Sequence, residues 1–389
     1  MSTMKEEGKK NNNVPNLRFP EFKEEWVRTR LGDIAVFKKG KGISKNDISI
    51  EGKTDCIRYG ELYTYYDEVI EDVISTTNLN PDNLILSEEN DIIIPSSGES
   101  SIEIAKASCV QKSGVALGGD LNIIKTNSYG NFLAYYLNNK KKNNIGRIAQ
   151  GSSVVHLYAK QLSKLNIALP TINEQYKIGS FLNLIEKRIK AQIKIIENLE
   201  SLMKGLGKKI FSQKLRFHNV DGNRCNDWKK VKLEDVLEIG SGRDYKHLKE
   251  GNIPVFGTGG FMTSVEGFLY EGESVGIGRK GTIDKPVFLK GKFWTVDTLF
   301  YTHSFKQVFP KFIYYLFLQI NWKKYNEATG VPSLSKSTIE KIKIKTPCLA
   351  EQTKILKFLS SFDEKIKSEK YLLQQYKKQK QYLLQNMFI

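Results

Sequence analysis

The chain has 389 residues, 40% of them hydrophobic, which is enough for two or three domains with their own cores. Its formal net charge of +17 favours a polyanionic partner such as nucleic acid, because cations that bind phosphates release condensed counterions. The sequence holds no long apolar run and begins with polar residues, so we expect no membrane span and no signal peptide, and a cytoplasmic protein.

Residues 1–16 are polar and rich in Lys and Asn, which predicts a disordered tail. Residues 17–170 then show β-like runs from Asp91 and Val115, separated by Gly and Ser turns, and an amphipathic helix from Asn131. A loop of small residues, QGSSVVHL, precedes one more strand. This pattern predicts a first lobe of α+β structure.

Residues 171–213 carry apolar side chains in alternating steps of four and three, the a/d spacing of a left-handed coiled coil. No proline interrupts the pattern, and a helix of about 40 residues would be roughly 60 Å long. Gln192 falls on the same stripe, where it either fixes the register or lies in solvent. The predicted seam residues are Ile178, Leu182, Ile185, Ile189, Ile196 and Leu199.

Residues 214–347 repeat the first lobe in shorter form. Trp26 recurs as Trp228 (228 − 26 = 202), whereas Glu174 at the start of the first long helix recurs as Glu351 at the start of the second (351 − 174 = 177). We call this second spacing, which relates matching positions of the two long helices, the helix offset. The second lobe is therefore shorter by 202 − 177 = 25 residues. It again shows short strands, an amphipathic helix and a small-residue loop, TGVPSLSK, and a repeat of this length indicates a duplicated domain with its helix.

Residues 348–389 predict a second long helix with the same seam, in which Glu369 matches Gln192. Copies related by an approximate two-fold axis would pair the two helices as an antiparallel coiled coil, and a general helical bundle is the alternative. Lys380 falls on the stripe near the end of the chain, where we expect it in solvent. The predicted seam residues are Ile355, Leu359, Phe362, Ile366, Leu373 and Tyr376.

The search for catalytic motifs is negative: the sequence has no Walker A loop, no H-E-x-x-H motif and no histidines spaced as metal ligands. The cysteines lack C-x-x-C spacing, so we expect buried thiols. FGTGGF from Phe256 resembles the glycine turn of an adenosylmethionine site but lacks the flanking strand and helix. Gly276, Gly278 and Gly281 satisfy G-x-G-x-x-G, yet the basic residues between them and the absence of a following helix pattern favour a basic hairpin. We therefore predict no catalytic group, metal or cofactor on this chain.

Several features together resemble the specificity subunit of type I restriction-modification systems. The resemblance rests on two variable lobes that alternate with two matching helices, on the LRFPEF opening at Leu17, on the NEQ and AEQ tripeptides at Asn173 and Ala350, and on the small-residue loops. It covers residues 17–389. It implies that each lobe is a target-recognition domain that reads one half of an asymmetric bipartite DNA site, and that the helices fix the spacer between the halves.

The resemblance also implies partners: double-stranded DNA, two methyltransferase (modification) subunits docked on the helices, and translocase-nuclease (restriction) subunits in the full complex. Adenosylmethionine, ATP and magnesium would then bind to the partner subunits, and this chain would be non-catalytic. A standalone two-lobed DNA-binding regulator is the alternative, although such proteins usually carry a helix-turn-helix and dimerise to reach two half-sites. An autonomous adenine methyltransferase does not fit the missing motifs.

Basic, aromatic and hydroxyl side chains on turn-like segments are candidates for DNA contact, and for any one of them the alternative is a solvated surface side chain. Arg can pair bidentately with guanine, whereas Lys more often positions the phosphate backbone. The candidates in the first lobe are Lys38, Lys39, Lys41, Arg58, Tyr59, Tyr63, Ser96, Ser97, Lys106, Ser152 and Ser153. Those in the second lobe are Arg243, Lys246, Thr258, Arg279, Lys280, Thr329 and Ser333.

Overall fold

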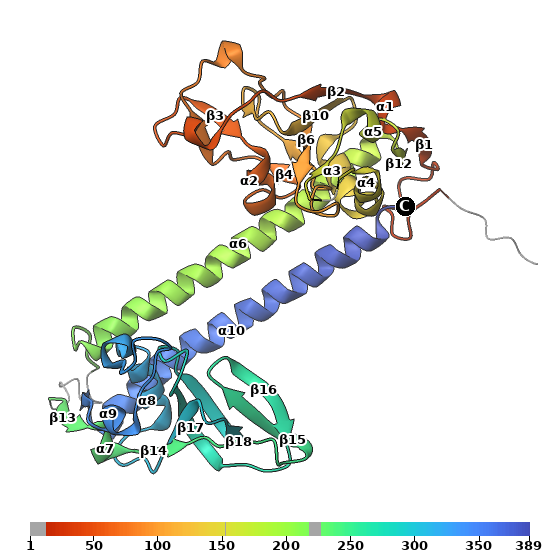
Figure 1. Cartoon of the computed structure of the whole chain (residues 1–389). Coiled ribbons are helices and arrows are strands. Elements are labelled where there is room, and N and C mark those ends of the chain that lie inside the picture. The colour runs from red at the N-terminus through yellow and green to blue at the C-terminus, as the bar shows by residue number, and fades with distance from the viewer. Residues whose placement is uncertain (1–12, 152, 218–226) are drawn as a thin grey trace, which may run out of the picture. The chain divides into compact units, whose positions relative to one another are not determined.

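A computed structural model describes residues 13–151, 153–217 and 227–389 of the chain. It divides into two compact units: unit 1 holds the chain up to Ile193 together with Leu372–Ile389, and unit 2 holds Lys194–Tyr371. The two long helices are α6 (Ile172–Phe211) and α10 (Leu349–Asn386), with 40 and 38 residues (Figure 1). Each unit therefore contains one lobe and part of both long helices.

The lobe of unit 1 is built on a five-stranded sheet in the order β2-β10-β6-β8-β4, antiparallel except between β4 and β8. The central strand β6 has the sequence DIIIP and is buried at every position, because both faces of the sheet are covered. Ile92 and Ile94 pack against Phe132 of helix α3, and Ile93 packs on the opposite face against Leu62 of helix α2. The strands are β2 (Ala35–Lys39), β4 (Val69–Ile70), β6 (Asp91–Pro95), β8 (Ser108–Val110) and β10 (Leu121–Thr126).

Smaller elements complete this lobe. Strands β1 (Val27–Arg30) and β12 (Asn166–Leu169) form an antiparallel pair at the start of α6. The other strands are β3 (Thr54–Ile57), β5 (Ser75–Thr77), β7 (Ser97–Gly98), β9 (Ala116–Leu117) and β11 (Val155–His156). The helices are α1 (Leu31–Ile34), η1 (Lys45–Asp47), α2 (Tyr59–Thr64), η2 (Pro81–Asn83), α3 (Gly130–Asn139), α4 (Lys142–Ile148) and α5 (Ala159–Leu162).

The lobe of unit 2 follows the same plan with a six-stranded sheet in the order β14-β19-β17-β18-β15-β16. Helix α8 packs on it, with Phe312 and Tyr315 in one core with Val275 and Ile277 of β17. The strands are β13 (Lys229–Lys232), β14 (Glu238–Ser241), β15 (Glu250–Gly257), β16 (Gly260–Val265), β17 (Tyr270–Gly278), β18 (Val287–Thr295), β19 (Leu299–His303) and β20 (Lys343–Thr346). The helices are α7 (Leu233–Val236), α8 (Pro310–Phe317), η3 (Trp322–Tyr325) and α9 (Lys336–Glu340).

The long helices pair antiparallel within each unit, as an approximate two-fold relation between the two copies predicts. In unit 1 the guanidinium of Arg188 lies 4.6 Å from the ring centroid of Tyr376, and Glu186 pairs with Lys380 at 2.6 Å, so the residue numbers rise on α6 as they fall on α10. Every predicted seam residue is buried or half-buried, whereas Leu184, which lies off the seam on α6, is 65% exposed. The pattern of apolar residues therefore located the faces that meet.

Two polar seam positions lie inside the coiled coil. Gln192 is only 6% exposed. Lys380, which we expected in solvent, instead lies between Glu186 of α6 at 2.6 Å and Glu68 of the first lobe at 3.3 Å. The expectation was wrong because Glu68 is far from Lys380 in the sequence, and only folding brings together the two carboxylates that make a half-buried ammonium favourable.

The same ion pair attaches each lobe to the start of its helix. The guanidinium of Arg18 donates to both carboxylate oxygens of Glu174 at 2.8 and 2.7 Å, and Arg216 does the same to Glu351 at 2.8 and 3.0 Å. Both glutamate side chains are fully buried. The repeated LRF and NEQ/AEQ motifs are therefore the two halves of one bidentate contact, which adds geometric specificity to the attraction of the charges.

The glutamine that follows each glutamate caps the helix of its lobe. The side-chain oxygen of Gln175 accepts the backbone N–H of Tyr129 at 3.0 Å, directly before α3, and Gln352 accepts that of Phe309 at 3.0 Å before α8. A buried helix start has unpaired N–H groups that need such acceptors. These contacts explain why Glu and Gln stand together in both copies.

The C-terminal end of the chain completes the core of the first lobe. Phe388 is 2% exposed, and the backbone N–H of Leu17 donates to the carbonyl of Asn386 at 2.9 Å. In unit 2, Leu215 makes the same bond at 3.0 Å to Lys209, which precedes Asn386 by the helix offset. The first lobe is therefore closed by residues from the far end of the chain, whereas the second is closed by residues that directly precede it.

Residues 13–16, which we expected in the disordered tail, lie against this lobe, where Pro15 is buried and the carbonyl of Asn13 accepts the N–H of Trp26 at 2.8 Å. The rest of the predicted tail lies outside the described residues. Cys56 and Cys109 are buried free thiols, whereas Cys348 is exposed, contrary to our expectation. Cys348 directly precedes α10, outside the apolar seam.

Candidate nucleic-acid interface

The turn after the central strand of the first lobe meets the small-residue loop. Strands β7 and β11 pair Ser97 with His156, and the N–H of Leu157 donates to the carbonyl of Ser96 at 3.0 Å. Gln150 and His156 close the loop by two backbone bonds of 2.9 and 2.7 Å. Two segments that are distant in the sequence thus form one ridge.

The second lobe builds the same ridge. An isolated bridge pairs Lys280 with Ser333, the N–H of Leu334 donates to the carbonyl of Arg279 at 2.9 Å, and that of Glu327 donates to Ser333 at 3.0 Å. Glu327, Ser333 and Leu334 all follow their first-lobe counterparts by the helix offset. The bridge and two of its backbone bonds therefore recur, while the paired side chains differ and the N–H of Ser333 donates to the side chain of Asn326 at 2.9 Å.

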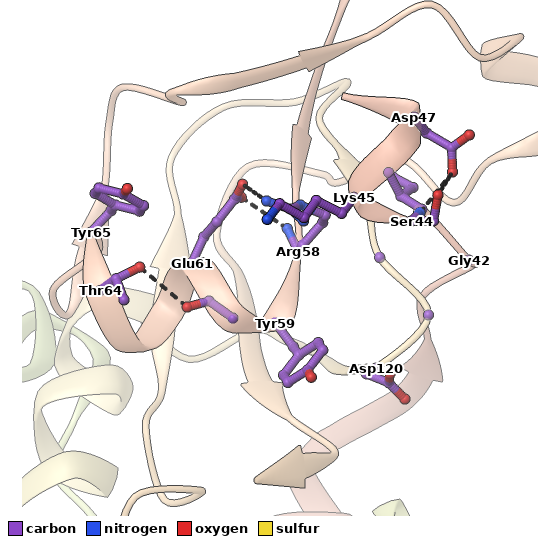
Figure 2. A pocket seen from close by; sticks show the side chains of 14 residues that line it. Gly42, Ser44, Lys45, Asp47, Arg58, Tyr59, Glu61, Thr64, Tyr65 and Asp120 are labelled. Atoms are coloured by element: carbon purple, nitrogen blue, oxygen red, sulfur yellow. Dashed lines mark hydrogen bonds and ion pairs between the residues drawn. The ribbon is translucent and has the colours of Figure 1, made fainter. Parts of the chain in front are cut away.

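A pocket of about 910 Å³ opens beside helix α2 of the first lobe. Its wall carries an ion pair in which the backbone N–H and the guanidinium of Arg58 donate to Glu61 at 3.0 and 3.1 Å (Figure 2). Glu61 also accepts the hydroxyl of Ser75 at 2.6 Å and is 3% exposed, so Arg58 is held firmly at the rim. The other lining residues are Gly42, Ile43, Ser44, Lys45, Asp47, Tyr59, Gly60, Thr64, Tyr65, Gly118, Gly119 and Asp120.

A neighbouring pocket of about 600 Å³ joins helix α2 to the ridge. The hydroxyl of Tyr63 donates to the carbonyl of Ser97 at 3.1 Å, and the rings of Tyr59 and Tyr63 meet edge to face at 6.4 Å. Burial raises the pKa of the Tyr63 hydroxyl, which keeps it a donor. Arg58, Tyr59, Tyr63 and Ser97 were predicted separately, and the structure brings them together.

The other candidates of the first lobe are more dispersed. Lys38 and Lys39 are exposed on the edge strand β2 and line neither pocket, and Ser96 is buried with its backbone in the ridge. The N–H of Lys41 donates to the carbonyl of Leu117 at 2.9 Å, close to the larger pocket. Lys106 is half-buried outside both pockets, Ser153 is exposed in the small-residue loop, and Ser152 lies outside the described residues.

In the second lobe, a pocket of about 620 Å³ lies at the ridge itself and is lined by Arg279, Lys280 and Ser333. The guanidinium of Arg279 donates to the carbonyl of Asp297 at 3.4 Å and lies 5.8 Å from the ring centroid of Phe300. Both basic side chains are exposed. The remaining lining residues are Ser241, Asp297, Thr298, Phe300, Glu327, Leu334, Ser335 and Lys336.

The remaining candidates of this lobe do not line that pocket. The hydroxyl of Thr258 is 3.8 Å from the place of a β-carbon on Gly281, whose φ of +91° marks the tight turn of the ridge. The N–H of Arg243 donates to the carbonyl of Thr295 at 2.8 Å, the bond that Lys41 makes in the first lobe, and Lys246 is exposed on the same loop. Thr329 is exposed in the small-residue loop.

Sequence reasoning missed three residues of these surfaces. Lys45 and Tyr65 line the larger pocket of the first lobe and are close in the sequence to the predicted Lys41 and Tyr63. His156 was considered only as a metal ligand, although it precedes the predicted Ser333 by the helix offset. That offset was the signal that could have located it.

The two glycine motifs are part of the sheet. FGTGGF forms the turn between β15 and β16, where Gly260 has a φ of +107°, and Gly276 and Gly278 lie in β17, which pairs with β18 as the predicted basic hairpin. Among the described residues, no group of three or more His, Cys, Asp or Glu side chains could hold a metal ion. No helix in the described parts of the chain is long and apolar enough to cross a membrane.

Comparison with known proteins gives a consistent result. The family described as type I restriction modification DNA specificity domain matches residues 23–201 and 226–378. The chain is 25% identical over 415 residues to the type I restriction enzyme MjaVIII specificity subunit of Methanocaldococcus jannaschii, which covers 95% of this chain and 92% of that protein. It is 28% identical over 115 residues to a putative type I restriction enzyme specificity subunit of Haemophilus influenzae, 28% of this chain and 30% of that one.

Two solved structures share the fold. The S subunit of a type I restriction-modification system from M. genitalium has a TM-score of 0.69 at 18% identity, over 97% of this chain and 99% of that chain. A chain from work on complex assembly and conformational transition of the type I R-M system has a TM-score of 0.55 at 14% identity, over 94% and 97% of the two chains.

Proposed function

Because the chain belongs to the type I restriction modification DNA specificity family, we propose that its two lobes read the two halves of one asymmetric DNA site. The chain is a non-catalytic specificity subunit. The family assignment does not favour a standalone regulator. The observation that supports a split site most directly is the ridge, which recurs with one backbone and two different sets of side chains.

The two surfaces differ in chemistry. The first lobe offers Tyr59, Tyr63 and Ser97 around the Arg58–Glu61 pair, whereas the second offers the exposed cations Arg279 and Lys280. Hydrogen-bond donors on cations match the O6 and N7 acceptors of guanine in the major groove. In this proposal the two half-sites therefore differ in sequence, which makes the whole site asymmetric.

The long helices are the proposed docking site for two methyltransferase subunits. Within unit 2, Ile195 and Leu202 lie seven residues apart on α6 and are 44% and 51% exposed. Exposed apolar groups that repeat on one helix face indicate a protein interface. Ile195→Asp and Leu202→Asp should therefore weaken co-purification with the methyltransferase subunit, and Ser201→Asp, at a polar exposed neighbour, is the control.

The partners carry the chemistry in this proposal. The methyltransferase subunits bind adenosylmethionine, and translocase-nuclease subunits, which join the full complex, use ATP and magnesium. The empty motif search and the absence of a metal-ligand cluster among the described residues support this division. The role left to this chain is to position the DNA.

The test compares Arg279→Ala with Lys290→Ala, a matched loss of charge on the same lobe whose side chain is 76% exposed and away from the ridge. The modified site is first mapped by sequencing methylated host DNA, and binding of the assembled methyltransferase complex to that duplex is then measured by fluorescence anisotropy. Loss of one base contact costs about 1–3 kcal/mol. We expect that loss for Arg279→Ala and little change for Lys290→Ala; equal effects, or a methylated site that is not split, would contradict the proposal.

A further inference from the structure

One position on the ridge carries different chemistry in the two lobes. In the first lobe, Ser97 faces His156 across the bridge, and in the second Lys280 faces Ser333. The neighbouring backbone bonds agree closely, at 3.0 and 2.9 Å from Leu157 and Leu334. A change of side chain at this position therefore changes the chemistry of the surface without displacing its backbone.

The imidazole of His156 is oriented for one outward contact. Its Nδ1 lies 3.3 Å from the hydroxyl oxygen of Ser97, and its ring stacks on Tyr158 at 6.1 Å. Its Nε2 has no hydrogen-bond partner among the described residues, and the ring is only half-buried. A histidine held at one nitrogen presents a single defined donor or acceptor at the other.

Lys280 differs from His156 in both charge and hydrogen bonding. Its ammonium is a donor only, it is exposed, and the adjacent Arg279 adds a fork of donors in the same pocket. Such donors select guanine, whose major-groove edge presents two acceptors. The imidazole Nε2 selects a base by one bond, in which it donates when the Ser97 hydroxyl donates to Nδ1 and accepts when that hydroxyl accepts.

We propose that the bridge pair, Ser97 with His156 in the first lobe and Lys280 with Ser333 in the second, determines one base pair in each half-site. His156 reads a base edge through Nε2, Ser97 is the positioning residue that holds the imidazole in place, and Lys280 with Arg279 reads a guanine. This inference rests on the proposed function and adds to it the residues that make the two half-sites different.

The test exchanges the pair between the lobes. Ser97→Lys with His156→Ser gives the first lobe the pair of the second, and Lys280→Ser with Ser333→His does the reverse. Each complex is assembled with its methyltransferase subunit, and its methylated sites are mapped by sequencing. We expect one base pair of the half-site read by the altered lobe to change, with about 5- to 150-fold altered discrimination, while the other half-site stays the same.

Single variants keep the test decisive if an exchanged pair impairs folding. His156→Ala retains the backbone bridge and should relax one base pair of its half-site, and Ile50→Ala, at an exposed position of the same lobe that lines neither pocket, should not. Ser97→Ala should relax the same base pair, and Ser97→Thr, which keeps a hydroxyl, should restore it. A merely structural role of Ser97 would instead lower methylation at all sites alike.

Two failures can be told apart. A wild-type complex whose methylated site is not split would overturn the proposed function. A wild-type complex with a split site that stays unchanged in His156→Ala and in both exchanges would overturn this inference alone.

Discussion

Replacing Phe388 by alanine should destabilise the first lobe and leave the second intact. Phe388 is the next-to-last residue of the chain, yet its ring centroid lies 5.5 Å from that of Phe132, 5.7 Å from Tyr136 and 6.5 Å from Trp26. It is 2% exposed. The C-terminal end is therefore part of the core of the first lobe, in the cluster that includes Phe132 of α3.

The size of the effect follows from this burial. Truncating a buried phenylalanine to alanine costs about 3–5 kcal/mol, because the cavity adds to the lost transfer free energy. With a urea dependence of about 1–3 kcal/mol per molar, the midpoint of unfolding should fall by at least about 1 M. Phe211 precedes Phe388 by the helix offset and packs on Trp228 at 6.1 Å and Phe312 at 5.4 Å, so Phe211→Ala is the matched variant for the second lobe.

The chain contains four tryptophans, of which Trp26 belongs to unit 1 and Trp228, Trp294 and Trp322 to unit 2. Fluorine NMR of protein labelled with fluorotryptophan therefore follows the two units separately during urea unfolding. Phe388→Ala should shift the transition of Trp26 alone, and Phe211→Ala should shift the other three. An unchanged Trp26 midpoint in Phe388→Ala would refute the placement of the C-terminal end in the first lobe.

The remaining predictions concern the helices and the thiols. Ile189 is 5% exposed in the seam, so Ile189→Glu should lower the free energy of unfolding by about 3 kcal/mol or more. Leu184→Glu, at a position 65% exposed, should change that free energy little. If calorimetry showed the same loss of stability in both variants, the seam assignment would be rejected. Four residues inserted after Ile193 of α6 together with four after Tyr371 of α10 add about 6 Å to each helix. Methylome mapping should therefore show a spacer between the half-sites that is longer by one or two base pairs, each about 3.4 Å. An unchanged spacer with full activity would contradict the idea that the helices fix its length. Burial raises the pKa of Cys56 to about 11 and that of Cys109 to about 12, so at pH 8 both thiols stay protonated. Mass spectrometry after iodoacetamide treatment should find Cys348 labelled in the native protein, and Cys56 and Cys109 labelled only in urea. Labelling of Cys109 in the native protein would disprove its burial.

The long helices were predictable because their signal is local. The a/d stripe repeats every few residues, and Ile178, Leu182, Ile355 and Leu359 are nearly or fully buried where the heptad places them. Strand β6 was equally clear, since three consecutive isoleucines stand between turn-forming residues. Periodicity of this kind needs no knowledge of distant partners.

The ridge could not be derived in the same way. Ser97 and His156 are 59 residues apart, and nothing in either loop indicates that the two form a bridge. The candidates were chosen by residue type alone, and the structure places them differently, since Arg58 lies at a pocket and Lys38 on an edge strand. The Arg18–Glu174 pair was visible as two repeated motifs, and only the fold shows that they bind each other.

The central claim is that each lobe reads its own half-site, and an exchange of the first lobe tests it most directly. The exchange should replace residues 17–170 together with residues 383–389 by homologous segments, because Leu383, Met387 and Phe388 belong to the core of that lobe. The assembled complex is then expressed, and its methylated sites are mapped by single-molecule sequencing. The account predicts one new half-site beside one unchanged half-site at the same spacing, and a change in both half-sites, or in neither, would contradict it.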